Sequence, residues 1–148
     1  MAKIRVSTVI DADIGAVWSA VEDISTHTRW MGDAEAIRFT SEARRGIGTT
    51  FDCDTKVGPF RLRDAMEITR WDPGMAMGVR HVGLVTGTGE FTLVPAGTGR
   101  TEFRWEEELD FPRWMGGTIG DAVGRRVLER VWRANLARLK ALVEQRHH

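Results

Sequence analysis

A long amphipathic segment at the end of the chain restricts the fold more than any other feature. The pattern from about Arg113 to Gln145 predicts one helix, with an apolar stripe that includes Val123, Val127 and Val131. Arginines occupy much of the remaining helix surface, so one face is apolar and the other is solvated. The apolar face needs a second apolar surface to cover it.

Most of the sequence before this helix alternates between apolar and polar residues, which is typical of half-buried strands. Short turns separate the alternating segments, so successive strands are expected to pair as hairpins in an antiparallel meander. A curved sheet of this kind with one long helix across it can leave a cavity, and such cavities bind apolar small molecules. The predicted strands cover residues 3–10, around 37–39, 49–57, 60–71, 75–82, 84–94 and 101–109.

Two short helical segments are expected between the first and second strands. Val17, Trp18 and Val21 recur at helical spacing, and either Asp11 or Asp13 can cap the segment that contains them. The stretch 23–31 is interpreted as a second short helix or turn, which a glycine then stops.

Composition excludes several classes of protein. The 148 residues suffice for one domain, residues 1–148, and the 21 acidic and 21 basic residues cancel, which argues against a nucleic-acid partner. Cys53 is the sole cysteine, so no internal disulfide can form, and a cytoplasmic location is expected. The N-terminus lacks the pattern of a signal peptide, and no apolar run approaches the roughly 20 residues of a membrane span.

Three strings, together with the order of elements, resemble a known family. They are Val17-Trp18 followed by Asp23 and Arg29-Trp30, the glycine turn Gly46-Ile47-Gly48-Thr49-Thr50-Phe51, and Gly99-Arg100-Thr101-Glu102-Phe103-Arg104-Trp105 before the long helix. This combination is similar to the START-like (SRPBCC) superfamily, which is related in fold to the birch-pollen allergen. Within it, the sequence most resembles the polyketide cyclase/dehydrase and lipid transport family.

The resemblance implies an α+β helix-grip fold. In that fold a seven-stranded antiparallel sheet curves around the C-terminal helix, two short helices follow the first strand, and a cavity lies inside. The family includes lipid and hormone carriers, aromatase/cyclases and proteins of no known activity. It has no shared catalytic motif, so the resemblance assigns no catalytic residue, and the fold does not choose a function.

Three ionisable residues fall on the apolar phase of predicted strands. Asp64 is in phase with Leu62 and Met66, His81 follows Met75, Met77 and Val79, and Glu107 follows Phe103 and Trp105. Burying such groups is costly unless they are paired. They therefore indicate a polar patch in a cavity, unless they sit at strand ends open to water or a bulge turns Asp64 outward.

Three functions remain open on this pattern. In the first, the polar groups orient an apolar or aromatic ligand that is polyketide-, lipid- or isoprenoid-like. In the second, a cyclase or dehydratase uses His81 with Asp64 or Glu107 as general acid and base. In the third, the domain grips a partner protein and holds no small ligand. Binding is favoured because spacing across strands does not establish hydrogen-bond reach.

The expected pocket combines aromatic, sulfur-containing and ionisable side chains. Cys53 is interpreted as a small buried hydrophobe rather than a nucleophile. No metal site or cofactor is expected, and the chain is expected to be a monomer or a homodimer. The residues expected to line the pocket are Trp30, Cys53, Asp64, Met66, Met77, His81, Phe91, Trp105, Trp114 and Ile119.

Glycines are concentrated in the first part of the predicted C-terminal helix, at positions 116, 117, 120 and 124. Each interior glycine costs about 1 kcal/mol relative to alanine. One interpretation is a loose lid at the cavity mouth, with Trp114 and Met115 as an apolar plug. The alternatives are close packing against the sheet or a helix that starts at Thr118.

Overall fold

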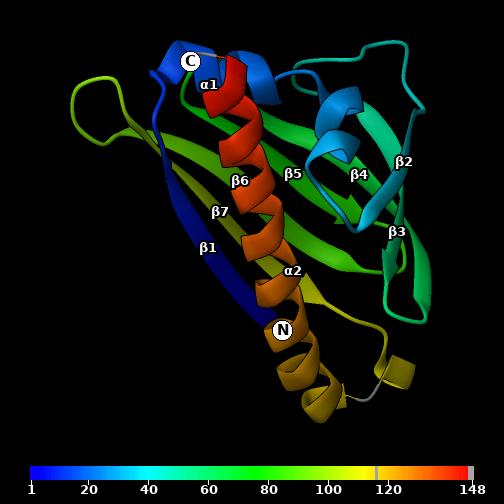
Figure 1. The fold of residues 1–148 in the computed structure, drawn as a ribbon. Coiled ribbons are helices and arrows are strands. Elements are labelled where there is room, and N and C mark those ends of the chain that lie inside the picture. Colours follow the sequence, from blue (N-terminus) through cyan, green and yellow to red (C-terminus); the bar gives the residue numbers. More distant parts are fainter. Residues whose placement is uncertain (116, 147–148) are drawn as a thin grey trace.

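The chain folds into one curved antiparallel sheet with a long helix, α2, across its concave face (Figure 1). The computed structural model describes residues 1–115 and 117–146. The strand order is β1-β7-β6-β5-β4-β3-β2. In chain order the elements are β1 (Ala2–Ile10), α1 (Ile14–Val21), the 3-10 helix η1 (Ile24–Arg29), β2 (Ala34–Phe39), β3 (Thr50–Val57), β4 (Phe60–Asp72), β5 (Ala76–Val82), β6 (Thr86–Pro95), β7 (Thr101–Asp110), the 3-10 helix η2 (Arg113–Met115) and α2 (Gly117–Arg146).

The topology is a six-stranded meander with one additional strand. Strands β2 to β7 each pair with the next along the chain, whereas β1 pairs with β7 at the far edge. Helices α1 and η1 therefore carry the chain from one edge of the sheet to the other. This arrangement confirms the helix-grip fold and the antiparallel meander.

The two short helices form where the apolar spacing predicts them. The side chain of Asp13, rather than Asp11, caps α1 by accepting a hydrogen bond from the Ala16 backbone N–H at 2.9 Å. Val17 and Val21 then lie buried against the sheet. Asp23 caps η1 in the same way, through the Ser25 backbone N–H at 3.1 Å.

The long helix differs from the prediction at its start. Arg113 to Met115 form the separate turn η2, and α2 begins at Gly117. Glycine is a poor helix former, and α2 begins at one, Gly117. In the residues that the structure describes, no helix is both long and apolar enough to cross a membrane.

Two strand boundaries also differ from the alternating pattern. Met75 was expected on the inward face of a strand, but it lies in the turn before β5 and is 60% exposed. The turn is closed by the Met75 N–H, which donates to the Asp72 carbonyl at 2.9 Å, and Gly74 supplies its positive φ of 76°. At the next hairpin, β6 begins at Thr86 rather than Leu84, and Leu84 is exposed.

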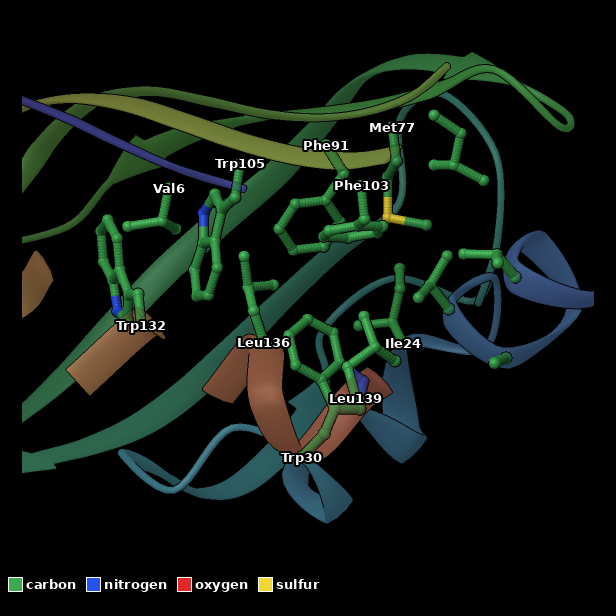
Figure 2. Packing of buried hydrophobic residues seen from close by; sticks show 14 of the residues in the cluster. Val6, Ile24, Trp30, Met77, Phe91, Phe103, Trp105, Trp132, Leu136 and Leu139 are labelled. Atoms are coloured by element: carbon green, nitrogen blue, oxygen red, sulfur yellow. The ribbon is translucent and has the colours of Figure 1, made fainter. Parts of the chain in front are cut away.

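The helix and the sheet pack tightly along the second half of α2 (Figure 2). Leu136 and Leu139 are completely or almost completely buried there, beside Trp30 and Phe103. Nearer the middle of the helix, the Trp132 and Trp105 rings stack with centroids 4.4 Å apart and planes 16° apart. We call this half, from Trp132 to Val143, the packed half of α2.

Candidate functional site

A cavity of about 380 Å³ lies between the sheet and the first half of α2. Its walls come from η1, from strands β2 to β7 and from α2 between Val123 and Trp132. Most of the lining is apolar, including Phe51, Leu62 and Val79. Val123 and Val127, which the sequence placed on the apolar stripe of the helix, are exposed and line this cavity instead of packing into the core. We call the part of α2 from Val123 to Leu128, which lines the cavity, the hollow half of α2.

One polar cluster interrupts the apolar wall. His81 on β5 lies between two carboxylates, with Nδ1 at 2.9 Å and 3.0 Å from the two oxygens of Asp64 and Nε2 at 2.7 Å from Oε1 of Glu107. Asp64 comes from β4 and Glu107 from β7. All three residues expected on inward phases thus meet at one point. We refer to them as the carboxylate–imidazole cluster.

The bulge that could have turned Asp64 outward lies elsewhere on β4. The register of β4 against β5 shifts between Ile68 and Arg70, after Asp64. Asp64 therefore keeps the phase of Leu62 and Met66, which both line the cavity.

Glu107 reaches His81 across an intervening strand. Strand β6 lies between β5 and β7, and its Gly89 pairs directly with Glu107. A Cβ atom on Gly89 would lie 2.2 Å from Oε1 and 2.7 Å from Cγ of Glu107, closer than real side chains approach. The missing side chain leaves the space that the Glu107 carboxylate crosses. The sequence analysis did not foresee this gap, for which a glycine on the inward phase between polar residues was the available signal.

The cluster holds a proton more tightly than its parts would in water. Burial lowers the pKa of His81, but hydrogen bonds to Asp64 and Glu107 outweigh it and raise the pKa to about 10. Burial raises the pKa of Glu107, and the hydrogen bond to His81 offsets this in part. The proton between Nε2 and Oε1 can belong to either residue. The cluster therefore carries one net negative charge, whether it holds an imidazolium and two carboxylates or a neutral ring beside a protonated Glu107.

The two other reactive side chains at the cavity are neutral. Burial lowers the pKa of His27 to about 4, and its Nε2 donates to the Val21 carbonyl at 2.7 Å. Burial raises the pKa of the Cys53 thiol to about 12, so almost no nucleophilic thiolate forms at neutral pH. In the part of the chain that the structure describes, no three His, Cys, Asp or Glu side chains are placed to hold a metal ion.

Asp33 ties α2 to the segment before β2. Its carboxylate accepts hydrogen bonds from Asn135 Nδ2 at 2.7 Å and from Trp132 Nε1 at 3.3 Å. The side-chain oxygen Oδ1 of the fully buried Asn135 accepts a hydrogen bond from the Gly32 N–H at 2.9 Å. Sequence reasoning missed this link, although a lone asparagine among leucines in an amphipathic helix is a signal for a buried polar contact.

Seven of the residues expected to line the pocket do so, and three do not contribute described side chains to it. Trp30 packs into the core against Phe91, Phe103 and Trp105, because η1 directs it away from the hollow. Trp114 is 67% exposed and does not line the cavity, so it cannot serve as the expected plug. The side chains of Ile119 and Met115 lie outside the described residues, as does position 116. The seven that line the cavity are Cys53, Asp64, Met66, Met77, His81, Phe91 and Trp105.

Comparison with known proteins agrees with this architecture. The model of one family, described as polyketide cyclase/dehydrase and lipid transport, matches residues 1–144. The chain belongs to that family. Among curated proteins, no sequence gives a significant match to this family member.

Solved structures share its fold at low sequence identity. The Zhui aromatase/cyclase from Streptomyces sp. R1128 superposes with a TM-score of 0.82 at 14% identity, over 99% of this chain and 95% of that one. A START superfamily protein from Mycobacterium smegmatis gives 0.80 at 11% identity, over 98% and 99%. A protein from Thermus thermophilus gives 0.78 at 18% identity, over 99% of both chains. At these identities the likeness shows the fold alone.

Proposed function

We propose that the protein binds one apolar or aromatic small molecule in the cavity, with the body of the ligand against the apolar walls and one polar end at Asp64. The observation that carries this proposal is a hollow of about 380 Å³ with mostly apolar walls, into which the carboxylate–imidazole cluster faces. Small-molecule sites usually combine apolar walls with a few placed polar groups. The family description, which names both polyketide cyclisation and lipid transport, supports an apolar ligand.

Asp64 is the cluster member that a ligand can reach. Its side chain is 17% exposed, against 5% for His81 and 6% for Glu107. Both nitrogens of His81 already face a carboxylate, so the ring offers no free nitrogen to a ligand. Orientation of the ligand therefore falls to the carboxylate of Asp64, held in place by His81.

Titration with N-phenyl-1-naphthylamine, a neutral apolar dye that fluoresces when it leaves water, tests this proposal. Saturable fluorescence is expected with the wild-type protein. Val79→Phe, which fills part of the cavity, should weaken dye binding about tenfold or more, because an added ring occupies the space the dye needs. Val9→Phe adds the same ring at an exposed site on β1 and should leave dye binding unchanged. Absence of saturable binding, or equal binding by Val79→Phe, would refute the proposal.

A cyclase or dehydratase is a second candidate, favoured specifically by the carboxylate–imidazole cluster. In that case Asp64 would take a proton from the substrate, and His81 would act as a positioning residue between the two carboxylates. Asp64→Asn should then abolish conversion of a synthetic poly-β-ketone while sparing its affinity. Equal product formation by wild type and Asp64→Asn, or none by either, would count against catalysis. The hollow interior gives no support to a domain that merely grips a partner protein.

A further inference from the structure

The described residues that line the cavity include acids but no lysine or arginine. The acids are Asp33, Asp64, Glu90 and Glu107. The stretch 115–121, whose side chains are not described, also contains no lysine or arginine in its sequence. The one cationic group that this described lining can hold is the His81 imidazolium, and both of its nitrogens already face a carboxylate, so it is not free to pair with a buried anion.

Strand alternation directs the two arginines that adjoin the cluster in sequence toward the other face of the sheet. Arg63 precedes Asp64 and Arg80 precedes His81, but successive side chains of a strand point to opposite faces. Both arginines are paired with acids of neighbouring strands: Arg63 with Asp54 at 3.6 Å, and Arg80 with Glu67 at 3.3 Å. They are therefore not placed to neutralise charge in the cavity.

The four acids of the lining are not equivalent. Glu90 forms an ion pair with Arg70 at 2.5 Å. Asp33 accepts hydrogen bonds from Trp132 and Asn135, which hold it to α2. Asp64 and Glu107 share His81, and this cluster retains one net negative charge for either position of its inner proton. Asp33 has only neutral partners, but both of its oxygens accept hydrogen bonds from α2, so Asp64 is the acid whose negative charge a ligand in the hollow can best reach.

We infer that the cavity, if it binds ligands as proposed above, selects them by charge: it takes apolar molecules whose polar end is a hydrogen-bond donor, best a protonated amine, and rejects anionic amphiphiles of the same shape. An ammonium group beside Asp64 gains a charge-assisted hydrogen bond in a poorly solvated site. A carboxylate there loses its hydration, meets a cluster with net negative charge and finds no cation that is not already paired. A neutral alcohol donates to Asp64 without the ionic gain and ranks between them.

A matched series of three competitors tests the ranking. N-phenyl-1-naphthylamine serves as the reporter, and decylamine, 1-decanol and decanoate displace it near neutral pH, below their micellar concentrations. Decylamine should bind about tenfold or more tighter than decanoate, with decanol between them. The ranking is measured on the wild-type protein, so it does not depend on any variant folding.

Two variants then assign the effect to Asp64. Asp64→Asn removes its charge at nearly constant shape and should reduce the amine-to-carboxylate ratio to within about threefold, while decanol binding changes little. Asp52→Asn removes one negative charge from the neighbouring strand β3, outside the cavity lining, and should preserve the ratio. Thermal unfolding of both variants shows that they are folded.

The outcomes separate the two proposals. If the reporter does not bind the wild-type protein, the proposed function fails and the charge selection fails with it. If the reporter binds but decanoate displaces it as well as decylamine does, charge selection is overturned and the binding function stands. If the ratio is unchanged in Asp64→Asn, or falls equally in Asp52→Asn, the assignment to Asp64 is overturned.

Discussion

The two halves of α2 cover the same sheet in different ways, and two buried histidines also differ from each other. His27, which also contributes to the cavity wall, packs into the core against the rings of Trp30 and Phe91, with centroids 5.3 Å and 5.9 Å away. At the hollow half, His81 lies between two carboxylates. Burial lowers the pKa of His27 to about 4, whereas carboxylate partners overcome the effect of burial and raise that of His81 to about 10.

The comparison teaches that burial alone does not define the role of a polar residue. His27 satisfies its ring with a backbone carbonyl and behaves as part of the core. His81 keeps a charge that the apolar surroundings oppose, next to empty space. Retained charge beside a cavity, rather than a buried histidine as such, is what indicates a functional site.

The largest expected contrast concerns packing. Leu136→Ala in the packed half should lower the free energy of unfolding by about 3–4 kcal/mol, because it leaves a void in a filled core. Val127→Ala in the hollow half should cost less than about 1 kcal/mol, since Val127 is partly exposed and faces a space that is already empty. Urea denaturation measures both. Similar losses in the two variants would remove the distinction between the halves.

The next largest effect is expected for Gly89→Ala, which should lower the free energy of unfolding by about 3 kcal/mol. The new Cβ displaces Glu107 and breaks a buried charge pair. The same substitution at Gly15 in α1 is the control, where the Cβ would meet Asp13 Oδ1 at an ordinary 3.6 Å. Gly15→Ala should be neutral or slightly stabilising. NMR titration of Gly89→Ala should also show a lower pKa for His81, and an unchanged pKa would contradict the assigned role of the glycine.

The alkaline limb of the stability curve should come from His81. Because its pKa in the folded protein, about 10, is above the unfolded value of 6.5, its contribution is fully present below pH 6.5 and is lost as the pH rises toward 10. The loss should approach about 1.4 kcal/mol per pH unit. Urea unfolding between pH 6.5 and 7.5 measures it, because in this range little of Cys53, whose pKa is 9.0 in the unfolded chain, ionises. A slope that persists in His81→Gln would contradict this origin.

On the acid side of the stability curve, the loss of stability should be smaller and should come from His27. Its pKa in the folded protein, about 4, is below the unfolded value of 6.5, so the unfolded chain takes up the proton first as the pH falls. Stability should decline by about 2 kcal/mol between pH 6.5 and 5. His27→Gln should flatten this limb and leave the alkaline limb intact. If instead it altered the alkaline limb, the two histidines would not be independent.

The elements could be predicted from sequence because apolar periodicity is a local property. It identified six of the seven strands closely and put Asp64, His81 and Glu107 on inward phases. It misplaced Met75 because apolar and polar residues can alternate by chance across a β-turn and the strand that follows it.

What the pattern could not show were relations between distant segments. Whether Glu107 reaches His81 depends on strand order, on register and on the absence of a side chain at Gly89, all of which arise in the folded sheet. Trp30 likewise looks suited to a pocket, but the path of η1 turns it into the core. The resemblance to a family predicted the seven-stranded helix-grip fold with its cavity but assigned no functional residue.

The missing side chain at Gly89 links the curvature of the sheet to the protonation of the cluster. Neighbouring strands are about 4.8 Å apart, so side chains two strands apart meet only where the sheet bends and nothing stands between them. The Glu107–His81 contact spans that distance. A bulky ligand that flattens the sheet would separate Glu107 from His81. The pKa of His81 therefore depends on how strongly the sheet is curved at this point.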